Sequence, residues 1–165
     1  MQNGLIHEDS AFLNFRDGTF RWVDVKYLRL PAEPAGDREL LAALVGHEQF
    51  RDDYAGGGVL PEGTRHGPYW LRLVTPDAYE DVGREKSAHV LREWADRFGV
   101  LPGELEADLR RLVFDPLAAA DAVHHLSGLG DEAFHDWGGV HGEFHEFVLL
   151  DRTAGRITLL VAADD

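Results

Sequence analysis

The chain has 165 residues, and its hydrophobic fraction of 44% is sufficient to form a buried core without disulfides or a structural metal. It contains no cysteine, which excludes thiol nucleophiles, iron–sulfur clusters and thiolate zinc sites. Sixteen basic and thirty acidic residues give a formal net charge of −14, which argues against a nucleic-acid partner. These features predict a single globular domain over residues 1–165.

The N-terminal ten residues are polar and acidic, unlike a secretory signal peptide. No apolar run reaches the roughly 18–20 residues that a membrane-spanning helix needs. We therefore expect a soluble, cytoplasmic protein without a membrane partner.

The first predicted element is a β-hairpin over residues 11–30. Asp17 and Gly18 favour a two-residue turn, because both residue types tolerate the positive φ that such a turn requires. This turn would pair Leu13 with Trp22. It would place four large apolar side chains on one face of the hairpin: Leu13, Phe15, Phe20 and Trp22.

The middle of the chain alternates turn signals with amphipathic segments. A helix is expected from Asp37 to about Val45, with leucines facing inward. A glycine-rich loop over residues 55–67 then precedes a strand over residues 69–74. Further helical patterns cover residues 84–98, 102–113 and 115–127.

The chain closes with a second hairpin, whose strands cover residues 143–150 and 156–162. Both strands are apolar on both faces, which is typical of central strands. The sequence therefore predicts an α+β fold. We expect a mostly antiparallel sheet of about five strands (N-terminal hairpin, middle strand and C-terminal hairpin) with several helices packed on it.

Histidines gather in one segment: five of the nine lie between His124 and His145. His141, Glu143 and His145 would share one face of an extended strand, and they are the ligand types of a mononuclear zinc or iron site. Three such ligands spread along about 13 Å of strand, which opposes binding to one ion. The first expectation is therefore that no metal or other cofactor binds and that these histidines pair with surplus carboxylates. A zinc or iron site is the alternative.

Aromatic residues border several loops and helix ends. They either fill the core or form a binding surface for a basic protein. The residues predicted for such a surface are Tyr69, Trp70, Trp94 and Trp137. Tyr69 and Trp70 directly follow the glycine-rich loop.

Three functions follow from these observations. The first is an acidic protein-binding or inhibitory module, similar in size and charge to antagonist and immunity proteins, that covers a basic partner surface. The second is an enzyme with a histidine–carboxylate site around residues 135–145, with or without a bound metal ion. The third is a small-molecule binding domain in which the 55–67 loop acts as a lid.

Overall fold

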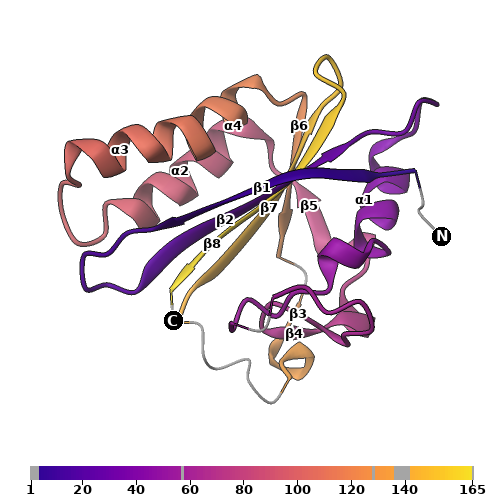
Figure 1. The fold of residues 1–165 in the computed structure, drawn as a ribbon, viewed down its shortest axis with the longest axis horizontal. Coiled ribbons are helices and arrows are strands. Elements are labelled where there is room, and N and C mark those ends of the chain that lie inside the picture. The colour runs from indigo at the N-terminus through magenta and orange to yellow at the C-terminus, as the bar shows by residue number, and fades with distance from the viewer. Residues whose placement is uncertain (1–3, 57, 128, 136–141, 165) are drawn as a thin grey trace.

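The computed structural model describes residues 4–56, 58–127, 129–135 and 142–164, and it confirms the α+β fold (Figure 1). The main sheet is antiparallel throughout and has six strands in the order β1-β2-β8-β7-β6-β5. Its strands are β1 Ile6–Asn14, β2 Arg21–Arg29, β5 Tyr79–Asp81, β6 Ala122–Leu126, β7 Phe144–Asp151 and β8 Arg156–Asp164. The predicted C-terminal hairpin is thus confirmed, and its strands β7 and β8 are central.

Helices and short turns connect the strands. The α-helices of the described residues are α1 Asp37–Val45, α2 Gly83–Ala95, α3 Gly103–Leu109 and α4 Asp115–Ala119. A π-helical turn, η4 Arg110–Phe114, joins α3 to α4. The remaining short elements are η1 Glu48–Phe50, β3 Arg65–His66, β4 Tyr69–Trp70, η2 Leu71–Leu73, η3 Pro76–Ala78 and η5 Asp131–Ala133.

The main sheet is covered on both faces (Figure 1). On one face, α2, α3, η4 and α4 pack against apolar residues of β2, β6, β7 and β8. On the other face, α1 and η1 pack against the alternate residues of the same sheet. This two-sided cover explains why the C-terminal strands are apolar at successive positions, since every side chain of their middle portions enters a core.

The predicted register of the N-terminal hairpin is wrong by one residue. Leu13 lies opposite Val23, and Asn14 lies opposite Trp22. The connection is a six-residue loop over residues 15–20, not a two-residue turn. Because side chains alternate between faces, this shift sends Trp22 to the face opposite Leu13.

Two further elements differ from expectation. The strand predicted over residues 69–74 shortens to β4, which pairs with β3 outside the main sheet. The helix predicted over residues 115–127 ends at Ala119, and β6 follows as a strand between β5 and β7. The strands that the middle of the chain contributes to the main sheet are therefore β5, at its edge, and the neighbouring β6.

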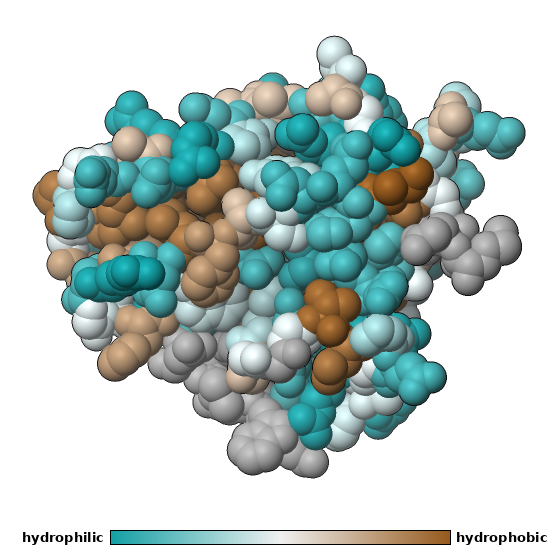
Figure 2. Space-filling view, in the orientation of Figure 1, coloured by the Kyte–Doolittle hydropathy of each residue, from teal (hydrophilic) through white to brown (hydrophobic). Residues whose placement is uncertain are grey.

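The surface in Figure 2 has an uneven distribution of hydropathy. Apolar residues gather over the end of the molecule that carries α2 and α3, whereas the middle of this face is mostly hydrophilic (Figure 2). Within the described residues, none of the helices combines the length and apolarity needed to cross a lipid bilayer.

Candidate functional site

A pocket of about 500 Å³ opens between strands β1 and β2 and the chain segment that follows η1. Its volume lies in the range of small-ligand pockets, roughly 300–1,000 Å³. This β1–β2 pocket is lined by Phe12, Asn14, Trp22, Asp24, Asp52, Tyr54, Ala55, Gly56 and Gly58. Two strands and one loop therefore contribute to the pocket.

Backbone hydrogen bonds hold the loop side of the pocket. Asp52 forms an isolated antiparallel bridge with Val59, and its carbonyl oxygen accepts a hydrogen bond from Gly67 N at 2.8 Å. The Asp52 carboxylate also accepts a hydrogen bond from Tyr54 N at 2.8 Å, which closes an Asx turn. These contacts fix the directions in which Asp52 and Tyr54 project.

Gly67 secures this loop against the sheet. It has a φ of +53°, and a Cβ atom at this position would lie 2.8 Å from Cε2 of the Phe144 ring.

We expect Gly67→Ala to lower the free energy of unfolding by about 2–4 kcal/mol, from the combined cost of overpacking and a left-handed backbone. Urea unfolding measures the change. Gly155→Ala is the matched control, because Gly155 has a φ of +68° but open space around it. Equal losses in the two variants would contradict the packing argument.

Three aromatic rings form one wall of the pocket. The Trp22 ring stacks on Phe12, with centroids 5.9 Å apart, and on Tyr54, with centroids 5.7 Å apart. Trp22 and Tyr54 are buried, whereas Phe12 is 60% exposed. The wall therefore runs from the protein interior to the surface. The Lys26 ammonium lies 4.4 Å from the centre of the Tyr54 ring, so the ring that is open to a ligand is that of Phe12.

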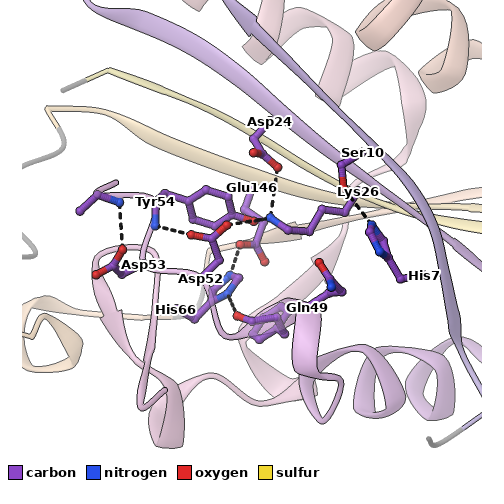
Figure 3. Close-up of polar contacts among 12 residues, drawn as sticks. His7, Ser10, Asp24, Lys26, Gln49, Asp52, Asp53, Tyr54, His66 and Glu146 are labelled. Carbon is purple, nitrogen blue, oxygen red and sulfur yellow. Dashed lines mark hydrogen bonds and ion pairs between the residues drawn. The ribbon is translucent and has the colours of Figure 1, made fainter. Parts of the chain in front are cut away.

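Charged groups meet next to Tyr54, as Figure 3 shows. Lys26 Nζ donates hydrogen bonds to Asp24 Oδ1 at 3.1 Å, to Asp52 Oδ2 at 3.0 Å and to Tyr54 Oη at 3.0 Å. These contacts use all three N–H donors of the ammonium group. One cation faces two carboxylates, so the charges in and under the pocket sum to one negative charge when all three groups are ionised.

Burial shifts the titration of two groups in this site. Desolvation raises the pKa of Asp24, and although Lys26 opposes this rise, the neighbouring Asp52 carboxylate adds to it. Burial also raises the pKa of Tyr54 well above its usual value, and Asp24 and Asp52 increase that shift. The Tyr54 phenol therefore keeps its proton at neutral pH, and the negative charge of the site comes from the carboxylates.

Behind the pocket lies a second polar cluster that is fully buried. The Glu146 carboxylate contacts His66 Nε2 through one oxygen and accepts a hydrogen bond from Tyr79 Oη through the other. His66 Nδ1 donates to the carbonyl oxygen of Phe50 at 2.6 Å, and the His66 ring stacks on the Phe50 ring with centroids 3.5 Å apart. Both His66 and Glu146 are at most 1% exposed. Neither residue lines the β1–β2 pocket, and their contacts join the loop to strand β7.

The structure separates the predicted aromatic binding residues from this pocket. Tyr69 stacks on Phe134, with ring centroids 5.4 Å apart. The Trp70 ring contacts two guanidinium groups, those of Arg65 and Arg72, whose Cζ atoms lie 5.5 Å and 5.3 Å from the ring centre. Both aromatic residues are half-buried, and neither lines the β1–β2 pocket.

The two remaining tryptophans have different positions. Trp94 belongs to the core under α2, where it is 1% exposed and contacts the edge of the Phe15 ring. Trp137 lies outside the described residues. The four residues predicted for one binding surface are thus not brought together in the described part of the chain, and their roles in binding stay predictions.

The predicted metal-binding triplet is described only in part, since His141 lies outside the described residues. His145 Nε2 lies 3.0 Å from Glu143 Oε1, and Glu143 also pairs with Arg97. His135 donates to a backbone carbonyl at 2.7 Å. Over the described ranges, no three histidine, aspartate or glutamate side chains group closely enough to hold a metal ion. The zinc or iron alternative therefore stays a prediction that depends on His141.

The adjacent pair His124 and His125 lies on strand β6, so the two rings point to opposite faces of the sheet. His124 is buried, and its Nε2 lies 2.9 Å from the Asp37 carboxylate at the start of α1. His125 stacks on Phe147 with ring centroids 4.4 Å apart. Both rings contribute to packing between elements.

Comparison with known proteins does not assign the chain to a family. No family model matches it, and no curated protein matches its sequence. Among solved structures, it is similar to a crystal structure of citrus MAF1, with 12% sequence identity and a TM-score of 0.39 over 92% of this chain and 93% of that chain. A structural similarity with so low a TM-score says nothing about function. The cytoplasmic location of the protein also stays a prediction.

Proposed function

We propose that this protein is a binding domain for a basic partner and that a cationic group of the partner enters the β1–β2 pocket. The observation that supports this most directly is the pairing of two carboxylates with a single ammonium at a pocket whose wall includes the exposed ring of Phe12. A guanidinium or ammonium group gains from both features, since ring faces attract cations and carboxylates form charge-assisted hydrogen bonds.

Asp24 is the carboxylate best placed to bind such a cation. Its side chain is 20% exposed, and one of its oxygens bonds to Lys26. The other oxygen accepts no hydrogen bond from any described residue. By contrast, both oxygens of Asp52 are occupied, by Lys26 and by Tyr54 N. An incoming cation therefore finds its free acceptor on Asp24.

The charge of the whole chain supports the same kind of partner. A formal net charge of −14 steers basic molecules toward the protein and repels nucleic acids. We expect this long-range attraction to weaken as salt is added, because the Debye length falls to about 8 Å near 0.15 M.

The test uses N-acetyl-arginine methylamide as a defined cationic probe, followed by NMR titration. We expect saturable shifts at pocket residues, with a Kd of about 1 mM or tighter. Asp24→Asn should weaken binding about tenfold or more, because it removes the charged acceptor while its amide oxygen still accepts from Lys26. Asp81→Asn, on the exposed far edge of the sheet, is the matched control and should leave the affinity unchanged.

The same titration has two further arms. The citrulline derivative has the shape of arginine without its charge, and equal binding of both would contradict the proposal. The pKa of Asp24 is raised, and its carboxylate is charged only above that pKa. The affinity for the arginine derivative should therefore be highest above this pKa and should fall as the pH is lowered through it. Asp24→Asn should lack this pH dependence.

A free organic cation of low molecular weight is the second candidate ligand. The pocket volume and the contribution of Ala55, Gly56 and Gly58 to its wall favour this possibility, which agrees with the predicted role of the 55–67 loop. Mass spectrometry of protein purified under native conditions separates the two candidates. A stoichiometric small cation released on denaturation would support the second candidate, and its absence together with capture of a basic protein would support the first.

A further inference from the structure

Strand β1 forms one edge of the main sheet, and among the described residues β2 is the only strand that pairs with it. Half of the backbone N–H and C=O groups of an edge strand face away from the sheet, where another chain can pair with them. Natural proteins usually protect such an edge with charges, prolines or bulges.

In β1 these protective features are confined to one end. The register shifts between His7 and Asp9, and Glu8 and Asp9 carry the charges of the strand. The remaining stretch, residues 10–14, pairs regularly with β2 and contains no charged residue and no proline. A five-residue stretch of the edge is therefore open to an added strand.

The open stretch borders the β1–β2 pocket. Phe12 and Asn14 line the pocket, and they lie opposite Asp24 and Trp22, respectively. Side chains opposite one another in neighbouring strands share a face. A residue added opposite Phe12 would therefore lie in one row with Phe12 and Asp24. The backbone of that residue would lie about two strand spacings, or about 10 Å, from the backbone of Asp24. An extended arginine or lysine side chain together with the aspartate side chain spans this distance.

We propose that the partner presents its cation on an extended segment that pairs with residues 10–14 of β1 as an additional strand. This inference rests on the proposed function, and it identifies the partner as a basic peptide segment with alternating side chains facing the pocket. Backbone hydrogen bonds then supply affinity, and the pocket selects the basic residue.

Charge favours such a segment over a second copy of this chain. Two copies would bring together two net charges of −14, together with Glu8 and Asp9 from each edge. Like charges placed across a strand pair are destabilising. A basic segment instead meets carboxylates both at the end of β1 and in the pocket.

The experiment compares the single arginine derivative with an acetylated, amidated nine-residue peptide that alternates threonine and valine around a central arginine. We expect the peptide to bind at least about tenfold more tightly than the arginine derivative, since strand pairing adds main-chain hydrogen bonds. Amide exchange should slow at alternate residues of the 10–14 stretch. Two N-methylated peptides provide the control: methylation of one alternate set of amides should abolish the gain, and methylation of the other set should preserve it.

The outcomes separate the two proposals. If the arginine derivative binds in an Asp24-dependent way but the peptide gains nothing, the strand inference is wrong and the pocket proposal stands. If neither molecule binds, both fail. Equal loss from the two N-methylated sets, or sedimentation showing that the protein alone dimerises with slowed exchange at residues 10–14, would also overturn the strand inference.

Discussion

Replacing Glu146 with leucine is expected to lower the free energy of unfolding by about 3–5 kcal/mol, because it leaves two buried polar groups without a partner. The carboxylate has two buried partners, His66 and Tyr79, and leucine would satisfy neither. Burial raises the pKa of Tyr79 well above its usual value, so its hydroxyl stays a donor that needs an acceptor.

The His66 ring explains why the side chain at position 146 must be polar. Its Nδ1 donates to the Phe50 carbonyl, so one proton is shared between Nε2 and the Glu146 carboxylate. Glu146→Gln preserves a donor for a neutral Nε2 and an acceptor for Tyr79. We therefore expect the glutamine variant to lose only about 1 kcal/mol.

Urea unfolding at neutral pH measures both variants. Glu62→Leu, at an exposed position, is the surface control and should change stability by less than about 0.5 kcal/mol. A leucine variant at Glu146 that unfolds like the surface control would show that the buried cluster does not hold the loop to the sheet. Equal losses for leucine and glutamine would instead contradict the shared-proton arrangement.

The parts of the fold that the sequence predicts well are those with strong local periodicity. Helix α1 matches its expected bounds because Leu40, Leu41 and Leu44 repeat at helical spacing and all three are buried. The C-terminal hairpin matches because residues 147–150 and 159–163 are continuously apolar, a pattern that is typical of strands buried on both faces.

Strand β6 shows where local pattern fails. An Asp-Pro start and several alanines favour a helix, and the chain is helical as far as Ala119. Beyond that point, pairing with β5 and β7 prevails, and Val123 and His124 face opposite cores. These contacts join residues far apart in the sequence, so a local pattern does not contain them.

The candidate pocket escaped prediction for a related reason. The loop of the first hairpin places Arg16 and Phe20 at positive φ, a conformation that these residue types rarely adopt. Trp22, Asp24 and Lys26 share one face of β2 in either register. The observed register places Phe12 and Asn14 of β1 beside that face, whereas the expected register put Leu13 opposite Trp22. The alternation of these three residues is visible in the sequence, but its meaning depends on a turn that the sequence does not signal.

Arg21 connects this same hairpin to helix α2, and its replacement is expected to have the other large effect. The side chain is 2% exposed, and its Nη1 donates to the carbonyl oxygens of Trp94 and Ala95, each at 2.7 Å. Nη2 donates to Asp17 at 3.1 Å. A cation at the last turn of a helix satisfies unpaired carbonyls and complements the helix dipole.

We expect Arg21→Leu to lower the free energy of unfolding by about 3–5 kcal/mol. It removes the side-chain donor of the Ala95 carbonyl, leaves the Trp94 carbonyl with only the 3.5 Å hydrogen bond from Arg97 N, and leaves Asp17 without its cation. Arg21→Lys should lose less, but still about 2 kcal/mol, since an ammonium lacks the planar fork that reaches both the α2 carbonyls and Asp17.

Arg29→Leu is the matched control on the same strand. Arg29 is exposed, and its 3.5 Å contact with Glu8 should contribute no more than about 1 kcal/mol to stability. Urea unfolding gives the three values, and hydrogen exchange should show faster opening of the last turn of α2 in the leucine variant alone. If Arg21→Leu and Arg29→Leu unfold alike, the end of α2 is held by packing against Phe15 and not by the guanidinium.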